Sequence, residues 1–318
     1  MESFTMVFLA VLALGLVLQL WLAARQASHI VAHAQRVPAA FADRVTPAEH
    51  QKAASYSLAR LGVERWDLAL SALVVVVWTL GGGLNWLDTR IAVMGLGPLW
   101  GGVVLILVTV LIGGLIDLPL SVWRTFGVEA KFGFNRNTPI GFVKDRLLAA
   151  LLTLLLGGPL LAVILWLMTS AGDLWWFWAW LVWMGFSLFV TWAYPVWIAP
   201  LFNRFEPLND RPLRRRLEQL LERCGFRSNG MFVMDGSRRS AHGNAYFTGF
   251  GANKRIVFFD TLLDGLEADE VEAVLAHELG HFKRHHIAKG MLLSSALSLA
   301  GLWLLGWLAQ EPWFYSGL

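Results

Sequence analysis

Two histidines and a glutamate in the stretch His277-Glu278-Leu279-Gly280-His281 have the types and spacing of a zinc peptidase motif. Residues four apart share one face of a helix, so His277 and His281 can direct two imidazole nitrogens at one metal ion. Glu278 lies next to that face, where its carboxylate can take the proton of a zinc-bound water that attacks a peptide carbonyl. The motif predicts one Zn²⁺ held by His277 and His281, with Glu278 as general base.

A stable zinc site needs a third protein ligand, and the sequence does not identify it. His285 lies eight residues after His277, roughly 12 Å along a helix axis, so it cannot join the same ion. We expect His286 to point away from the metal. His242 and Asp235 are candidates by position only. The identity of the third ligand, and with it the activity of this chain, stays open.

The motif lies near the end of a segment, residues 199–289, that has the composition of a small folded domain. Asp210 and Pro212 are typical of a helix start, and Gly225 of a helix end. The apolar stripe of that helix is expected to include Cys224. Strands are predicted at about 231–235, 244–250 and 255–260, followed by a helix from Glu267 to about Arg284. The expected fold of the segment is a small α+β, zincin-like unit.

The rest of the chain has the composition of a membrane protein. Of its 318 residues, 56% are hydrophobic and only 15% are charged, against about a quarter charged in soluble domains. Six stretches are long and apolar enough to cross a bilayer, at about 4–24, 67–84, 96–118, 147–170, 174–198 and 290–309. The first is interpreted as a retained anchor because it lacks a basic start. The prediction is an α-helical multi-pass protein with about six spans.

Positive charge predicts how these spans are oriented. Of the 26 Lys and Arg residues, 25 fall in the loops after spans one, three and five, and Arg90 alone falls on the other side. Loops rich in Lys and Arg stay in the cytosol. Segment 199–289 is therefore expected to face the cytosol, either from a bacterial inner membrane or from the endoplasmic reticulum. The bilayer is a partner, and nucleic acid is not expected to be one.

Several motifs together resemble the type I CAAX prenyl proteases, which are integral-membrane zinc metallopeptidases related to the membrane protease HtpX. His277-Glu278-Leu279-Gly280-His281-Phe282-Lys283 is similar to the zinc helix of that family. Its preceding strands are matched by 244–250, 254–257 and 259–263, and its membrane-exit motif by 198–203. Phe132-Gly133-Phe134-Asn135, with Thr138 and Asp145, resembles its third-loop motif.

The resemblance implies a helical barrel around an intramembrane chamber, with the zinc at its cytosolic end. It implies a protease that removes the last three residues of a prenylated carboxy-terminal motif. The family pattern also places Asn244, Ala245 and Tyr246 on a strand that binds substrate through main-chain hydrogen bonds. The alternative is an ordinary strand whose Tyr246 and Phe247 fill the core. The loop at 132–138 is either a simple turn or a substrate gate.

The resemblance also implies ligands that this sequence lacks. Family members take their third zinc ligand from a downstream glutamate, after a further span, whereas this sequence stops 37 residues past His281. We therefore expect the chain to be incomplete or catalytically impaired. Its expected parts are a five-span region at 1–198, the zinc segment at 199–289, and a sixth span and tail at 290–318, with the catalytic domain incomplete beyond that point.

The leading prediction is a membrane-embedded zinc endopeptidase that cleaves membrane-associated or prenylated peptide or protein substrates. One alternative is an impaired or truncated member that binds substrate or regulates without turnover. Another is a quality-control protease of membrane proteins. A transporter is less favoured, because ionisable residues cluster in the loops rather than within the spans.

Overall fold

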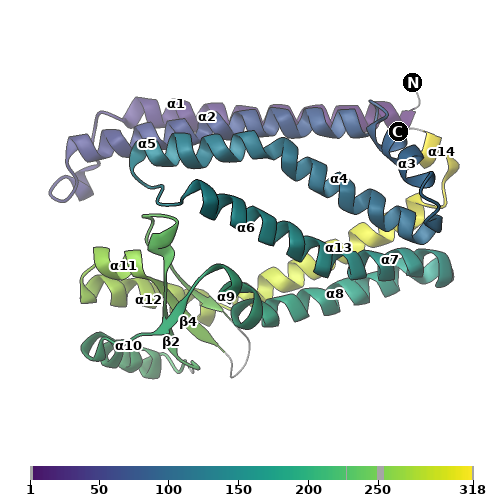
Figure 1. Cartoon of the computed structure of the whole chain (residues 1–318). Coiled ribbons are helices and arrows are strands. Elements are labelled where there is room, and N and C mark those ends of the chain that lie inside the picture. Colours follow the sequence, from purple (N-terminus) through teal and green to yellow (C-terminus); the bar gives the residue numbers. More distant parts are fainter. Residues whose placement is uncertain (1–2, 227, 249–253, 317–318) are drawn as a thin grey trace. The chain divides into compact units, whose positions relative to one another are not determined.

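The computed structural model describes residues 3–226, 228–248 and 254–316 of the chain (Figure 1). It divides into two compact units. The first comprises Met1–Asn135, Thr153–Leu165 and Trp307–Leu318, and the second Arg136–Leu152 and Trp166–Gly306. Each unit is described separately below.

The first unit is built from long apolar helices. It contains α1 (Ser3–His33), the short η1 (Ala39–Phe41), α2 (Pro47–Trp78), α3 (Gly83–Ala92), α4 (Gly97–Val122), η2 (Trp123–Glu129), α5 (Ala130–Phe132), η3 (Thr153–Gly157), most of α7 (Gly158–Ser170) and α14 (Pro312–Ser316). Helices α1 and α2 run side by side (Figure 1). A capping box between Thr46 and Glu49 starts α2 by satisfying two main-chain N–H groups. Arg65 of α2 donates to the main-chain oxygen of Ala23, which ties the pair together.

Three of the spanning helices continue through wider π-helical turns. The π segments η2, η3 and η5 (Tyr194–Ile198) join α4 to α5, α6 (Pro139–Leu152) to α7, and α8 (Trp175–Ala193) to α9 (Ala199–Phe202). Pro195 lies inside η5 and lacks the N–H that a regular turn would use. These π-helical turns were not predicted from the sequence.

The spans agree with the six expected from the sequence. Five helical stretches, Phe4–His33, Gly97–Phe132, Pro139–Ser170, Gly172–Phe202 and His286–Leu308, are long and apolar enough to cross a membrane. A sixth is formed if Pro47–Trp78 and Gly83–Ala92 count as one span, bent by 52°. Glycines at 81–83 permit that bend, since Gly82 has a φ of 74°. The chain is an α-helical multi-pass membrane protein.

In the second unit, two apolar helices pack directly against each other. The indole of Trp180 in α8 donates to the main-chain oxygen of Ser295 in α13 (His286–Leu308), at 3.1 Å. Nearer the other end of α13, Trp176 lies so close to Gly306 that an added Cβ would be 2.6 Å from its ring. Gly306 therefore allows the close approach of the two helices.

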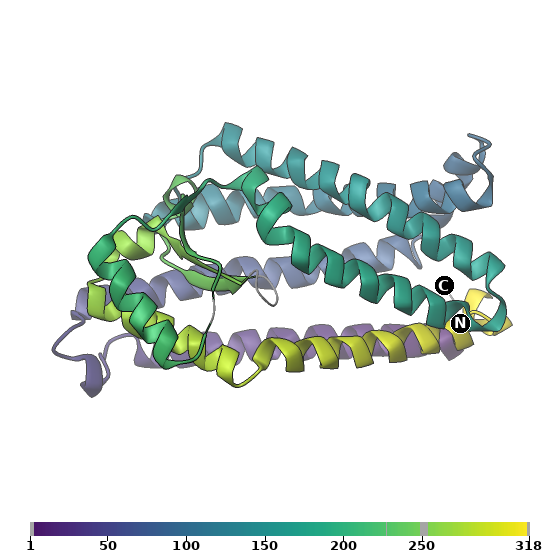
Figure 2. The same ribbon diagram turned by 90° about the horizontal axis from the view of Figure 1, so that it is seen from below.

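The second unit also contains a sheet, whose arrows are visible in Figures 1 and 2. It has four strands in the order β1-β2-β4-β3. Its strands are β1 (Phe205–Pro207), β2 (Met231–Met234), β3 (Ala245–Thr248) and β4 (Arg255–Phe259). The pairings of β1 with β2 and of β3 with β4 are antiparallel, while β2 and β4 are parallel. The predicted strands are thus confirmed at β2, β3 and β4, although Gly249 and Phe250 of the expected 244–250 strand lie outside the described residues. Strand β1 was not predicted.

Helices cover one face of the sheet and complete the core of the zinc segment. They are α10 (Arg211–Arg223), α11 (Asp260–Gly265) and α12 (Ala268–Lys283). Two short 3-10 helices, η4 (Gly172–Leu174) and η6 (Gly236–Arg238), also belong to this unit. Phe258, Leu217, Ile256 and Leu275 are almost completely buried in this core. The predicted α+β character of the segment is confirmed.

The end of α10 corrects the expectation for Cys224, which is exposed. The helix closes with left-handed Gly225, whose N–H bonds Glu222, while Phe226 N–H bonds the oxygen of Leu221. This is a Schellman motif, which folds the next apolar residue back onto the helix. Phe226 takes the core position instead of Cys224.

Candidate metal centre

Helix α12 presents the histidine motif on its last turns. Glu267 and Glu270 form a capping box at its start, and acidic side chains in the first turn suit the positive end of the helix. Val271, Leu275 and Leu279 are buried and bind the helix to the sheet. Because this face is fixed by the core, the face with His277 and His281 is directed outward.

The two motif histidines converge on a common point. Their Nε2 atoms are 3.2 Å apart, and their ring centroids 4.9 Å apart. A tetrahedral zinc with Zn–N bonds of about 2.0–2.1 Å separates two ligand nitrogens by roughly 3.3 Å. Two imidazole nitrogens at that separation fit two positions of a zinc site. An added Cβ at Gly280 would meet no described atom within 4 Å, so the space beside the motif is open.

His286 contacts the motif through the second ring nitrogen of His281, a contact that the sequence did not predict. Its Nδ1 lies 2.9 Å from Nδ1 of His281. A metal-binding histidine commonly fixes its ring by a hydrogen bond from its second nitrogen. With Nε2 of His281 directed at the metal position, the Nδ1–H of His281 can donate to His286. The sequence hid this contact because the helix ends at Lys283, between the two residues.

The other candidate ligands lie elsewhere. Asp235 accepts a hydrogen bond from the main-chain N–H of Arg204, at 2.7 Å, and its carboxylate lies 4.0 Å from Arg238. His285 lines a neighbouring pocket. In the described ranges, no group of three His, Cys, Asp or Glu residues could hold a metal ion. Glu278, which follows His277 in the sequence, is half-buried.

Strand β3 is an edge of the sheet and lies next to α12. Asn244 and Phe259 form a hydrogen-bonded pair, because Phe259 N–H donates to Asn244 oxygen at 2.9 Å. Hydrogen-bonded and non-bonded pairs alternate in an antiparallel ladder. The main-chain groups of Ala245 and Phe247 therefore face away from β4. The Ala245 N–H bonds the side chain of Asn244 at 2.8 Å, and no described strand pairs with this edge.

The side chains of β3 divide between the two faces of the sheet. Phe247 packs against the core, and Ala245 is buried in it. Tyr246 lies on the opposite face, against the ring of Phe259. Burial, and to a smaller extent Tyr194, raise the pKa of Tyr246 to about 12. The phenol is therefore neutral at physiological pH and does not serve as a general base.

The first part of the third-loop motif, residues 132–134, forms the end of α5 and the turn after it. Gly133 has a φ of 83° and ends α5 with a left-handed turn, and Phe132 and Phe134 pack against Tyr56. These contacts favour the simple turn over a gate for residues 132–134.

Asp145 has a role that the sequence does not predict. Its carboxylate accepts two hydrogen bonds from the guanidinium of Arg239, at 2.6 and 2.8 Å. Arg239 also donates to the side chain of Asn203 and to the main-chain oxygen of Phe202, both at 2.7 Å. One arginine thus joins α6, the exit from α9 and the segment that leads into β3. Its partners belong to two of the motifs recognised in the sequence, Asp145 to the third-loop motif and Phe202 and Asn203 to the membrane-exit motif, whereas Arg239 belongs to neither.

Two family models match consecutive parts of the chain. The model described as CAAX prenyl protease N-terminal, five membrane helices, matches residues 26–204. The model of peptidase family M48 matches residues 207–312, which include β2 to β4, α12 and α13.

Curated relatives and a solved structure are similar to the chain. A CAAX prenyl protease 1 homolog of Mus musculus is 32% identical, over 91% of this chain and 70% of the relative. A homolog of Oryza sativa is 43% identical, but the match spans 54% of this chain and only 41% of the relative. The crystal structure of S. mikatae Ste24p has a TM-score of 0.91 and 27% identity, and covers 99% of this chain and 74% of that one.

Proposed function

Because this chain belongs to peptidase family M48, with the five-helix membrane region of the CAAX prenyl proteases, we propose that it is a membrane-embedded zinc endopeptidase. The observation that carries the proposal is the 3.2 Å separation of the Nε2 atoms of His277 and His281. These residues would hold the ion, and His286 would orient His281. When bound, zinc supplies a Lewis acid that polarises a carbonyl and makes water more acidic.

Glu278 is proposed as the general base of the hydrolysis. Its carboxylate would accept a proton from the attacking water and pass it to the amine released by the broken peptide bond. One proton is taken up and one is delivered, so the carboxylate is regenerated in each cycle. Glu278 follows His277 directly on α12, which keeps base and metal position on adjoining faces of one rigid helix.

The edge of β3 is proposed to bind the substrate backbone. The outward oxygen of Ala245 and the outward N–H and oxygen of Phe247 can pair with an added strand. Asn244 would act by its side chain, which already bonds Ala245. Tyr246 would contribute through its ring, since its main-chain groups face β4. The arrangement supports an extended peptide chain beside α12.

The substrates are proposed to be membrane-associated peptides or proteins that carry a prenylated carboxy-terminal motif. The names of the relatives support this class, and so do the apolar spans on either side of the zinc segment. We propose that this segment faces the cytosol. The proposed parts of the chain are a five-span region at 1–198, the zinc segment at 199–289, and a sixth span and tail at 290–318.

The test combines metal analysis with peptide cleavage by protein purified from membranes. Glu278→Gln should keep zinc near the wild-type content and lower kcat by about 10²–10⁴-fold, because only the base is removed. His277→Ala should lose zinc. Glu218→Gln, an exposed glutamate of α10, is the matched control and should leave both quantities unchanged.

Two further comparisons define the substrate. A prenylated peptide should be cleaved faster than the same peptide without the lipid. A peptide that is N-methylated at one residue of the pairing segment should bind more weakly, because it loses a main-chain donor to the edge of β3. Wild-type protein without zinc, or a fully active Glu278→Gln variant, would contradict the proposal.

A further inference from the structure

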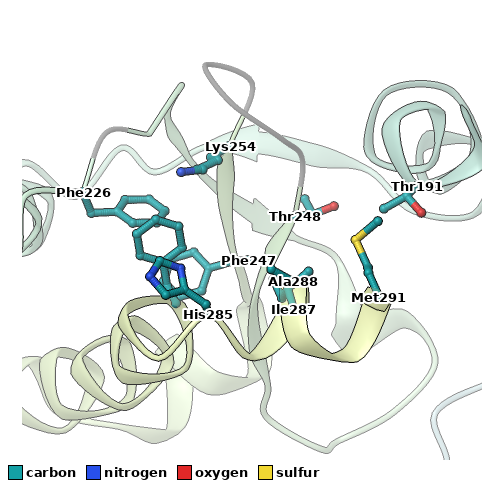
Figure 3. A pocket seen from close by; sticks show the side chains of 10 residues that line it. Thr191, Phe226, Phe247, Thr248, Lys254, His285, Ile287, Ala288 and Met291 are labelled. Atoms are coloured by element: carbon teal, nitrogen blue, oxygen red, sulfur yellow. The ribbon is translucent and has the colours of Figure 1, made fainter. Parts of the chain in front are cut away.

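A pocket of about 270 Å³ lies where α8 and α13 meet the sheet, next to the end of β3 (Figure 3). Its volume is close to the lower end of the roughly 300–1,000 Å³ common for small-molecule sites. The pocket is lined by Thr191, Phe226, Phe247, Thr248, Lys254, Phe282, His285, Ile287, Ala288 and Met291. None of these residues belongs to the proposed metal and base set.

Three aromatic rings form one wall of the pocket. The ring of Phe226 lies 5.1 Å from that of Phe247 and 4.7 Å from that of Phe282, between centroids. Phe226 is directed there by the Schellman turn at the end of α10. Ile287 and Met291 add an aliphatic wall from α13 (Figure 3). These walls favour a hydrocarbon chain.

A cation is positioned over the aromatic wall. The ammonium of Lys254 lies 4.2 Å from the ring centroid of Phe282 and 5.3 Å from that of Phe226. Among the ion pairs of the described residues, none includes Lys254. The rings offset part of the charge, and the ammonium can still bind an anion.

The turn between α12 and α13 adds further positive charge. Lys283, Arg284 and Lys289 are exposed, and no Asp or Glu occurs between Glu278 and Glu311. At the other end of α12, in contrast, Asp269 and Glu272 are paired with Arg216 and Arg223 of α10. The start of α12, whose carboxylates are paired, therefore faces α10, whereas the end of α12, whose basic residues are paired with no described carboxylate, adjoins the pocket.

His285 lines the pocket in a conformation that is unfavourable for its residue type. Its φ is 55°, in the left-handed region, and among the described residues other than glycine it alone has a positive φ. Such a residue is often retained for its side chain, because glycine would fit the turn without strain. Its imidazole adds a hydrogen-bonding group to the same pocket that Lys254 lines.

The place of the pocket in the fold indicates a lipid. Thr191 belongs to α8, and Ile287, Ala288 and Met291 lie in the first turns of α13, both of which are membrane spans. Basic residues at the cytosolic end of a span attract anionic headgroups. Hydrocarbon walls, an unneutralised cation and a position at the start of the α13 span, beside the α8 span, are the features of a phospholipid site.

We propose that this pocket binds one anionic phospholipid. The phosphate lies against Lys254 and the basic turn at 283–289, and one acyl chain lies along Phe226, Phe282 and α13. A free phosphate shares the headgroup chemistry but leaves the apolar walls uncovered. Neither Glu278 nor the metal takes part in this inference, although Phe247 of the proposed substrate edge also lines the pocket.

The experiment measures lipids retained by the protein after transfer from nanodiscs, by native mass spectrometry. The nanodiscs contain phosphatidylcholine with or without phosphatidylglycerol. Wild-type protein should retain phosphatidylglycerol in preference to phosphatidylcholine. Lys254→Gln should weaken that retention about tenfold, as expected for one charge-assisted contact, and Lys254→Arg should largely preserve it.

Two variants separate the charge from the cavity. Arg255→Gln removes the neighbouring cation, which lies over Phe232 at 5.2 Å and outside this pocket, and should change retention less than twofold. Ala288→Phe keeps Lys254 but fills the cavity, and should also lower retention. The melting temperature of each variant in detergent checks that the fold is intact.

Four results would overturn the proposal. They are equal retention of the two lipids, equal losses in Lys254→Gln and Arg255→Gln, competition by glycerol phosphate as effective as that by a short-chain phosphatidylglycerol, and displacement of the lipid by a prenylated peptide. The third result would indicate a simple anion site. The fourth would assign the pocket to the substrate.

Discussion

Arg239 joins several separate elements around the zinc segment. Its guanidinium bonds Asp145, Asn203 and the main chain of Phe202, and its own main-chain oxygen accepts from Arg136 N–H at 3.1 Å. Both side chains of the ion pair are only about a quarter exposed, at 22% and 26%. A planar guanidinium suits this paired geometry, which a lysine could not reproduce.

Arg239→Gln should therefore lower the free energy of unfolding by on the order of 2 kcal/mol, because Asp145 loses a charge-assisted partner in a half-buried position. The neighbouring Arg238 is 54% exposed and lies 4.0 Å from Asp235. Arg238→Gln is the control, with an expected change below about 0.5 kcal/mol. Thermal unfolding in detergent measures the stability of both variants. Equal shifts in melting temperature would contradict the structural role of Arg239.

The site could be predicted from the sequence where its chemistry is local. His277, Glu278 and His281 lie within five residues of one helix, so their spacing alone brings the two Nε2 atoms together. The contact of His286 depends on how the chain turns after Lys283, and periodicity says nothing of that turn. Arg239, the partner of Asp145, lies 94 residues away in sequence, so the sequence could not predict that contact either.

At the scale of elements, α10 and α12 are held together by charge as well as by their apolar faces. Arg216 bonds Glu272 and lies 2.5 Å from Asp269, and Arg223 bonds Glu272 at 3.1 Å. Hydrogen bonds from Arg216 hold the pKa of Glu272 below its usual value of 4.5. A lowered folded-state pKa means that the charged carboxylate stabilises the folded protein.

That contribution has a definite dependence on pH. It is fully present above the unfolded pKa of Glu272, near 4.5, and is lost as the pH falls through the lower folded pKa. Glu272→Gln should therefore melt at a lower temperature than the wild type at neutral pH, and the difference should vanish in acid. Glu218→Gln, which breaks an exposed pair within α10, should give a smaller difference at neutral pH. A Glu272→Gln difference that stays constant across this range would contradict the assignment.

The elements that the sequence predicts best are those with long, uniform patterns. The six spans, α10 and α12 follow from apolar length and helical periodicity. The sequence missed β1, which has only three residues and includes Pro207. It also placed the second span without its bend, because a local break between two apolar helices leaves mean hydropathy unchanged. The barrel and chamber implied by the family resemblance stay predictions.

For the whole molecule, the distribution of positive charge gives a topology that the native cysteine can test. Cys224 is exposed and is the one cysteine of the sequence. A membrane-impermeant maleimide should label it only after the cells are permeabilised, because the zinc segment is predicted to be cytosolic. Cys224→Ser should abolish the labelling.

Labelling at a second position, Val93, tests the opposite side of the membrane. Val93, 85% exposed at the end of α3, is close in sequence to Arg90, the one basic residue predicted outside the cytosol. Val93→Cys in the Cys224→Ser background should be labelled in intact cells. Labelling of Cys224 in intact cells would overturn the predicted orientation.

The two edges of the sheet differ in what they offer to another chain. In β1, the register places Phe205 and Pro207 outward, and Pro207 has no N–H to donate. In β3, the outward groups of Ala245 and Phe247 can accept a partner. A sheet with two open edges can polymerise into a ribbon, since each added copy exposes a new edge. Because Pro207 removes one donor from the β1 edge, pairing between copies would favour a dimer through β3, and a peptide bound to β3 would compete with it.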